Sequence, residues 1–308
     1  MRRIVRSVVL VGLVLPLVGW CALPSPWALR WVAPDRSSFM LHRVREARRA
    51  DTTLTLRHDW IALEDIAPAM VQAVIVAEDH RFREHGGVDW RALGEEVRYG
   101  GDAEFSWFDG ADRAALVEAL RYGWDHRSEI RGRSTITMQL ARNIFWTPDR
   151  SVVRKGMEVV LAPRMERWLS KDRILELYLN YAELGDGVFG VEAGAQHHFG
   201  VSAFDLTRYQ AASLAATLPH PRSSNPSHRP GRMAWRRDLI LRRMGGEEVV
   251  IPAAPAPVDI QVQDVDPPDV SLPAGALDTV PTGDPAAPDS AALPPPDTLR
   301  PDTVGPGA

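Results

Sequence analysis

A carboxylate at the end of an apolar run is the first feature that could do chemistry. Residues 67–77 are almost wholly apolar and predict a buried helix, which Glu78 and Asp79 follow directly. Apolar surroundings, an adjacent acid and the negative end of a helix dipole all disfavour an ionised Glu78. Such a carboxylate suits a general base that works near neutral pH. A plain helix end that reaches solvent, with residues 85–87 as a turn, explains the segment equally well.

Two further segments carry polar and basic side chains at helical spacing. If Ser134 caps a helix, one face is apolar and the other contains neither Glu nor Lys but Thr135, Gln139, Arg142 and Asn143. If Ser151 caps the next helix, Arg154, Lys155 and Glu158 share one face. This trio fits either a surface salt-bridge network or a group of cations that grips a diphosphate. The spacing does not choose between the two.

Helices are predicted throughout the middle of the chain, where they would position these residues. Residues 51–245 are interpreted as one mainly helical domain, because strand-like alternation is scarce and capping signals recur. Ser170 is placed as an N-cap, and Thr207 with Gln210 forms a capping box. The helix expected over 171–180 has an apolar face, and we expect it to brace the site rather than to react.

The N-terminal end predicts where the protein resides. An apolar run over 8–23 follows three basic residues, Arg2, Arg3 and Arg6. A bilayer crossing requires about 20 apolar residues, and flanking arginines stay in the cytoplasm. We therefore expect residues 1–23 to be a cytoplasmic stub and a single-pass anchor in the inner membrane. Residues 24–50 would be juxtamembrane, and the helical domain would face the periplasm. A cleaved signal peptide is the alternative.

Charge is distributed unevenly along the chain. Residues 251–308 carry nine Asp, one Arg and no Glu or Lys, a net charge of −8, so the remainder carries +4. We expect the Pro-, Ala- and Asp-rich residues 246–308 to be a disordered tail. The mildly basic body suits an anionic partner such as a phosphate or an acidic lipid surface. Nucleic acid is not expected as a partner, because no run of Lys or Arg alternates with aromatic residues.

Taken together, these segments resemble the monofunctional biosynthetic peptidoglycan glycosyltransferases, which are related to the glycosyltransferase domain of bifunctional penicillin-binding proteins. The resemblance covers residues 56–243 and rests on five motifs in the right order. They are Glu78-Asp79-x-x-Phe82-x-x-His85-x-Gly87, Ser134-Thr135-Ile136-Thr137-x-Gln139-Leu140, Arg154-Lys155-x-x-Glu158, Lys171-x-x-Ile174-Leu175-Glu176-x-Tyr178-Leu179-Asn180 and Arg236-Arg237. The stretch over 183–190 resembles the monofunctional branch in particular.

The resemblance implies an all-α, lysozyme-like fold and an inverting polymerisation of lipid II. The reaction would form β-1,4-linked glycan strands and release undecaprenyl diphosphate. Glu78 would take the proton from the 4-hydroxyl of the acceptor sugar, and Glu158 would orient or stabilise the diphosphate. The cations around the diphosphate would be Arg142, Arg150, Arg154 and Lys155. The substrate path would include Asp79, which supports local hydrogen bonding, and His85, Ser134, Thr135, Gln139 and Asn143.

The resemblance also sets the expected cofactors and partners. Mg²⁺ on the substrate diphosphate is compatible with the family, although no dedicated metal-ligand cluster is evident, and no organic cofactor is expected. The expected partners are lipid II, the growing glycan strand, membrane lipids and other cell-wall synthesis proteins. Two other functions are open alternatives. One is a lytic muramidase that uses a glutamate as an acid, and the other is an inactive cell-wall scaffold.

Two departures from the family pattern concern the loop before the second motif. Arg133 stands where the family has a small residue. The segment over 94–130 is longer than the family needs, and we expect one short helix within it around 114–121. Both features lie between the first two motifs, so substrate entry is where this chain is expected to differ from its relatives.

Overall fold

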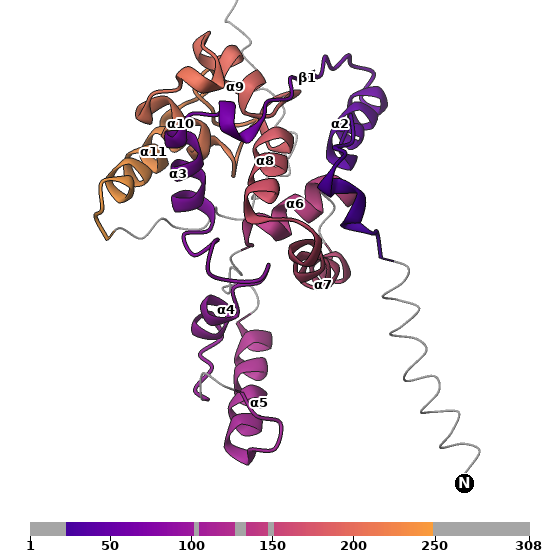
Figure 1. The fold of residues 1–308 in the computed structure, drawn as a ribbon, viewed down its shortest axis with the longest axis vertical. Helices are drawn as coiled ribbons and strands as arrows, with labels where there is room; N and C mark the ends of the chain where they lie inside the picture. The colour runs from indigo at the N-terminus through magenta and orange to yellow at the C-terminus, as the bar shows by residue number, and fades with distance from the viewer. Residues whose placement is uncertain (1–22, 102–104, 127–133, 147–150, 249–308) are drawn as a thin grey trace, which may run out of the picture. The chain divides into compact units, whose positions relative to one another are not determined.

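The computed structural model describes residues 23–101, 105–126, 134–146 and 151–248 (Figure 1). The expected anchor over 1–23 falls almost wholly outside these residues, and so do Arg133, Arg150 and most of the expected tail. Within the described residues, no helix has both the length and the apolar character needed to cross a membrane.

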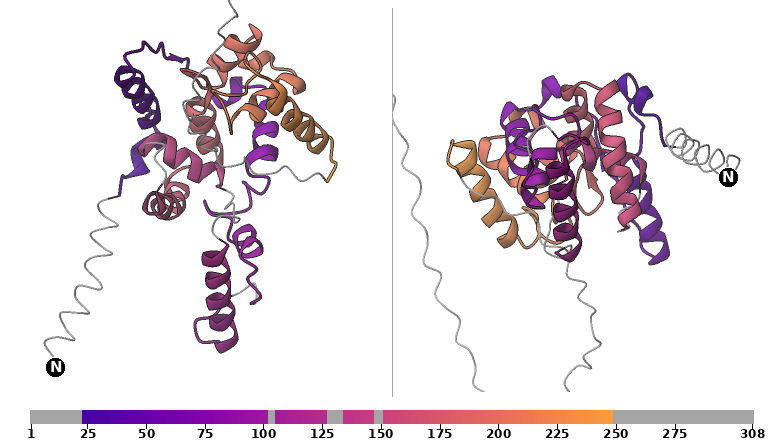
Figure 2. Two further views of the ribbon diagram at one scale, coloured as in Figure 1. Left: turned by 180° about the vertical axis from the view of Figure 1, so that it is seen from behind. Right: turned by 90° about the horizontal axis from the view of Figure 1, so that it is seen from below.

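The described residues are mainly helical, as expected for an all-α protein. Six helices carry most of the core, and they are α3 (Pro68–Glu78), α6 (Ile136–Phe145), α7 (Val152–Trp168), α8 (Lys171–Tyr181), α10 (Arg208–Thr217) and α11 (Gly231–Met244). Helices α3, α10 and α11 pack against one another, and α6 packs against both α7 and α8 (Figures 1 and 2). Each packs through apolar residues at helical spacing, and this burial stabilises the domain.

The helix starts follow the predicted capping residues with one exception. Ser151, Ser170 and the Thr207 capping box are confirmed as N-caps of α7, α8 and α10. Ser134 was the wrong cap for α6, because the hydroxyl of Thr135 accepts the Met138 N–H at 3.2 Å instead. The one-residue shift frees the Ser134 hydroxyl for another partner. Pro163 lies inside α7 without ending it.

A small sheet, which the sequence did not predict, lies beside α9 (Val191–Phe199). It consists of β1 (Arg57–His58), β3 (Val188–Phe189) and β2 (Glu183–Gly185), in that order across the sheet. Strand β1 pairs with β3 in parallel, and β2 pairs with β3 antiparallel. Gly187 in the β2–β3 turn has φ +71°, and a Cβ there would lie 2.7 Å from the Thr55 carbonyl oxygen. The turn therefore requires glycine.

The segment before residue 51 packs onto the same core. It contains the short 3-10 helix η1 (Pro26–Arg30) and α2 (Ser38–Arg49), and Leu29 and Met40 belong to the main apolar cluster. From α2, the Arg43 guanidinium donates two hydrogen bonds of 2.9 and 2.7 Å to the Glu183 carboxylate. These contacts join the segment that follows the expected anchor to the helical domain.

The segment between the first two motifs contains more helix than expected. Helix α4 (Trp90–Glu96) is followed by α5 (Gly110–Asp125), which extends well beyond the short helix predicted around 114–121. Asp112 of α5 connects this helix to the residues before it, since its carboxylate accepts hydrogen bonds from the Tyr99 hydroxyl and the Ser106 N–H. Several large apolar side chains here are exposed, among them Trp90, Trp107, Phe108, Leu120 and Trp124. The remaining elements are η2 (Leu63–Asp65) and η3 (Ala203–Asp205).

Candidate active site

Glu78 is the last residue of α3, and its side chain points to two donors from other helices. The Gln139 amide of α6 donates to one carboxylate oxygen at 2.8 Å, and the Arg236 guanidinium of α11 donates to the other at 3.0 Å. The Glu78 side chain is 12% exposed and that of Arg236 is 10% exposed. The carboxylate is thus held in one orientation and paired with a positive charge, while a small part of it remains accessible.

Gln139 is itself oriented by α8. Its amide oxygen accepts a 3.0 Å hydrogen bond from the Tyr178 hydroxyl, so its NH₂ group must face Glu78. Burial, and then the nearby negative charge of Glu78, raise the pKa of Tyr178 well above its usual value. The phenol therefore stays protonated and remains a donor. This contact gives α8 the bracing role that its sequence suggested.

Asp79 faces the protein interior and joins α3 to the start of α6. Its carboxylate accepts the backbone N–H of Ile136 at 3.1 Å and a hydrogen bond from His85 Nε2 at 3.0 Å. His85 Nδ1 accepts the Gly87 N–H at 3.2 Å, so the ring proton must be on Nε2. Both side chains of this pair are almost fully buried, at 4% and 9% exposure. Asp79 and His85 are therefore placed to hold the loop after α3.

Gly87 sets the distance between that loop and α7. Its φ is +95°, and a Cβ at this position would lie 2.6 Å from the Ala162 carbonyl carbon. Its carbonyl oxygen accepts a 2.6 Å hydrogen bond from the Thr135 hydroxyl, which also caps α6. The first motif is thus tied to α6 and α7 through backbone contacts that only glycine permits.

The basic residues of α7 surround a fully buried acid. Glu158 has no exposed surface, and its carboxylate accepts hydrogen bonds from Arg154 and, at 3.5 Å, from Lys155. Burial lowers the pKa of Lys155, and the charges of Arg142 and Arg154 lower it further, against an opposing effect of Glu158. The Lys155 side chain is 39% exposed. One face of this cluster is therefore an accessible concentration of positive charge.

Ser134 connects the acid at the end of α3 to the cations of α7. Its carbonyl oxygen accepts a 3.3 Å hydrogen bond from the Gln139 amide that also contacts Glu78. Its hydroxyl accepts a 2.6 Å hydrogen bond from the Lys155 ammonium. Gln139 and Ser134 thus connect Glu78 to Lys155 of the positive cluster through three hydrogen bonds. This is the arrangement on which the enzymatic interpretation of the sequence depends.

The other predicted residues lie near this network or outside the described chain. Arg142 is half-buried on α6, near enough for its charge to affect both Lys155 and Tyr178. Asn143 is buried one turn beyond Gln139, and among the described residues it makes none of the network's hydrogen bonds. Arg150 lies outside the described residues.

Arg236 is a site residue whose role was not predicted, although it belongs to the last of the five motifs. In the sequence it appears only as half of a late Arg-Arg pair, yet it donates to both Glu78 and the Ala77 carbonyl. A signal was present in its helix. Arg236 occupies the buried, otherwise apolar stripe of α11 that Met233, Ile240 and Met244 form. An arginine in such a stripe must have a buried acceptor.

Asp79, His85 and Asp89 are close enough to suggest a metal site, since one ligand atom of each lies within 4.8 Å of the others. Their polar atoms already have protein partners. Asp79 and His85 bind each other, and Asp89 accepts hydrogen bonds from Arg81 and from the Ala92 N–H at the start of α4. This group holds the loop after α3, and a bound cation would have to displace these contacts.

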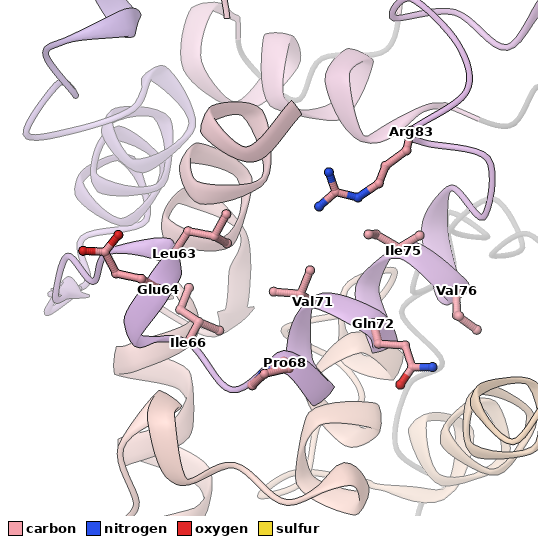
Figure 3. A pocket seen from close by; sticks show the side chains of 9 residues that line it. All are labelled: Leu63, Glu64, Ile66, Pro68, Val71, Gln72, Ile75, Val76 and Arg83. Atoms are coloured by element: carbon pink, nitrogen blue, oxygen red, sulfur yellow. The ribbon is translucent and has the colours of Figure 1, made fainter. Parts of the chain in front are cut away.

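A separate apolar pocket lies against the outer side of α3. Figure 3 shows its lining, in which Val71 and Ile75 of α3 face Leu63 and Ile66, with Arg83 at one end. Its volume is about 470 Å³. None of the hydrogen-bonded network residues lines it. The chemistry is therefore assigned to the network and not to this pocket.

Comparison with known proteins finds a matching family model and several similar proteins. The family model described as Transglycosylase matches residues 46–101 and 97–245. A biosynthetic peptidoglycan transglycosylase from Herminiimonas arsenicoxydans is 37% identical over 257 residues, which cover 81% of this chain and 98% of the relative. A protein of the same name from Janthinobacterium sp. (strain Marseille) is 40% identical over 77% of this chain and 92% of its own. One from Rhizobium leguminosarum bv. trifolii is 38% identical over 79% and 90%.

Proposed function

Because the chain belongs to the biosynthetic peptidoglycan transglycosylase family, we propose that Glu78 is the base that activates the acceptor sugar. The activity of the chain is that of a peptidoglycan glycosyltransferase, and its substrates are lipid II and the growing glycan strand. The proposal concerns how the side chains around Glu78 carry out that reaction. The observation that supports it most directly is the chain of hydrogen bonds from Glu78 through Gln139 and Ser134 to Lys155.

In the proposed reaction, Glu78 removes the proton from the 4-hydroxyl of the acceptor sugar. The resulting oxygen attacks C1 of the donor sugar from the face opposite the diphosphate. The bond from C1 to the diphosphate oxygen breaks as the new bond forms, so the configuration inverts from α to β and a β-1,4 link results. The leaving group is undecaprenyl diphosphate, which carries away the electron pair of the broken bond.

Gln139 and Arg236 position the base in this scheme. They donate to different oxygens of the Glu78 carboxylate, so residues from two helices, α6 and α11, fix its orientation. A base whose orientation is fixed before the substrate arrives does not have to be ordered during the reaction. Arg236 is therefore proposed as a positioning residue, and Tyr178 acts through Gln139 in the same way.

Lys155, Arg154 and Arg142 are proposed to stabilise the departing diphosphate. Negative charge grows on that group in the transition state, and preorganised cations lower the energy of this charge more than that of the bound substrate. Glu158 is proposed to hold the cations in position rather than to contact the substrate, because it is fully buried and accepts from Arg154 and Lys155. Arg150 is proposed as a further cation for the diphosphate only because the family resemblance implies it.

The described residues around this cluster do not fit a Mg²⁺ ion held by the protein. Mg²⁺ prefers oxygen ligands, and the carboxylate of the cluster, Glu158, already accepts hydrogen bonds from two cations. Lys155, Arg154 and Arg142 supply positive charge at the same place. An ion that reaches the site would have to be carried by the diphosphate of the substrate.

We also propose that the protein is held at the inner membrane with the helical domain in the periplasm. The support is the apolar run over 8–23 in the sequence and a set of exposed aromatic residues. Trp27 and Trp31 follow the run, and Trp107, Phe108 and Trp124 are exposed around α5. Aromatic side chains of this kind favour the membrane–water interface. The lysozyme-like fold and an association with other cell-wall synthesis proteins are expectations from the family.

Incubation of the full chain with lipid II tests the proposed reaction. Formation of β-1,4-linked polymer with release of undecaprenyl diphosphate is the expected result. Cleavage of finished glycan without polymer formation would indicate a muramidase instead. If neither product formed while the protein remained folded, an inactive scaffold would be the better description. Polymer with retained α configuration would contradict the inverting mechanism.

A further inference from the structure

A second concentration of positive charge lies where η1 meets the end of α7 and the start of α8. A pocket of about 460 Å³ there is lined by Arg30, Arg167, Trp168, Leu169, Ser170 and Arg173. Helix η1 packs directly against α7, so the pocket lies between two segments that are far apart in the sequence. Three of its six lining residues are arginines.

Two of these arginines have no acidic partner in the part of the chain that the structure describes. Arg30 and Arg167 are exposed, and among the described residues neither forms a salt bridge, whereas Arg173 is paired with Glu176 at 2.6 Å. The nearest acid of the α8 first turn, Asp172, is paired with Arg83. The pocket also contains the N-terminal end of α8, which carries a partial positive charge. The site therefore has an uncompensated charge that suits an anion.

Exposed tryptophans surround the pocket, and this side chain favours the membrane–water interface. Trp27 and Trp31 of the adjoining segment are 51% and 59% exposed, and Trp168 in the pocket itself is 43% exposed. The Arg30 guanidinium lies 5.4 Å from the centre of the Trp31 ring. Arg30 is also seven residues after Leu23, where the expected anchor ends, so even a fully extended chain would keep it within about 25 Å of that point.

The pocket is distinct from the cation cluster of the active site. Arg154 and Arg167 are thirteen residues apart on α7, which corresponds to about 20 Å along a helix. One diphosphate cannot contact both groups. An anion in this pocket is therefore distinct from the diphosphate that the cations beside Glu158 would contact.

We propose that this pocket binds the phosphate headgroup of an anionic glycerophospholipid. Arg30 and Arg167 pair with the phosphate oxygens, and Trp168, Trp27 and Trp31 lie at the level of the headgroups. The lipid source is chosen over free phosphate because of these tryptophans and the short distance to the expected anchor. In this respect the inference rests on the proposed location at the inner membrane.

The test uses the full chain in a neutral detergent with soluble lipids as probes. Thermal unfolding is followed during titration with dihexanoyl phosphatidylglycerol, dihexanoyl phosphatidylcholine or inorganic phosphate. Ligand binding to the folded state raises Tm in a concentration-dependent way. We expect phosphatidylglycerol to raise Tm at concentrations where the other two have no effect. The double variant Arg30→Gln/Arg167→Gln should bind it at least about tenfold more weakly, because each surface cation contributes to anionic-lipid affinity.

The matched control is the double variant Arg48→Gln/Arg208→Gln. These arginines are also exposed and form no salt bridge among the described residues, and they lie on α2 and α10. The control should bind phosphatidylglycerol as the wild type does. Equal binding by the pocket variant, or an equal response to phosphatidylcholine, would overturn the proposal. A response to inorganic phosphate equal to that of phosphatidylglycerol would overturn the assignment to a lipid.

The readout is independent of catalysis. It requires neither lipid II nor a bilayer, so a chain that forms no polymer would still show the binding. Conversely, the pocket variant should keep wild-type polymerisation in detergent solution, because Arg30 and Arg167 do not contact the hydrogen-bonded network around Glu78. Loss of the binding and loss of the proposed function are therefore separable results.

Discussion

Replacement of Arg236 by glutamine removes the positive charge beside the proposed base and leaves the base itself unchanged. In the wild type, Arg236 donates to the Glu78 carboxylate at 3.0 Å and to the Ala77 carbonyl at 3.1 Å. Both members of the ion pair are about one-tenth exposed. Arg236→Gln therefore leaves Glu78 with one hydrogen bond, from Gln139, and without a cation.

The expected magnitude follows from the strength of that contact. A hydrogen bond to a charged group contributes about 1.5–3 kcal/mol. If the contact orients Glu78 in the transition state, its loss lowers kcat by about 10- to 100-fold, since 1.36 kcal/mol corresponds to a tenfold change. The free energy of unfolding should fall by a similar amount.

Initial rates of lipid II polymerisation at saturating substrate measure this effect. Arg242→Gln is the matched control, since it removes the same charge from the same helix but its partner is Glu247. A double-mutant cycle with Glu78→Gln separates orientation from general damage, because Arg236→Gln should have little further effect in that background. If Arg236→Gln polymerised as fast as wild type, or if it lost equal activity without Glu78, the positioning role would be refuted.

Three further predictions test other contacts of the site. Gly87→Ala should lower the free energy of unfolding by about 3 kcal/mol because of the positive φ and the backbone contact. Denaturant titration measures this loss. The control is Gly86→Ala, which has open space around it, so its free energy of unfolding should change by less than about 1 kcal/mol. Lys155→Arg should move the alkaline limb of the pH–rate profile to higher pH. Burial lowers the pKa of Lys155, so the ammonium loses its charge at a lower pH than an exposed lysine does, whereas arginine keeps its charge. An unmoved limb would contradict this. Tyr178→Phe should reduce kcat about fivefold with little change in KM, because Gln139 loses the donor that orients it; unaltered steady-state kinetics would count against it.

Much of the fold was predictable because it is encoded locally. The apolar run over 67–77 predicted α3, and the hydroxyl side chains of Ser151, Ser170 and Thr207 predicted three helix starts. The cap of α6 was misplaced by one residue, since Ser134 and Thr135 can each cap and only the Gly87 carbonyl decides between them. The small sheet was missed because its strands have two or three residues, too few for an alternating pattern.

Most residues of the site were predictable from the sequence, but the contacts between them were not. The motifs identified Glu78, Gln139 and Lys155, yet helical spacing alone could not show that Ser134 contacts the last two. Arg236 lies 158 residues from Glu78 in the chain, and its pairing depends on how α11 packs against α3. Such long-range pairings are fixed by tertiary packing, which no local pattern reports.

Single-turnover conversion of lipid II by Glu78→Gln is the most direct test of the assigned base. The substitution keeps the size of the side chain and removes its ability to accept a proton. We expect the rate of bond formation to fall by about 10²- to 10⁴-fold, the usual contribution of a general base, while lipid II still binds. Glu84→Gln, an exposed position six residues later, should leave the rate within about threefold of wild type. A Glu78→Gln protein that forms polymer as fast as this control would contradict the role proposed for the carboxylate at the end of α3.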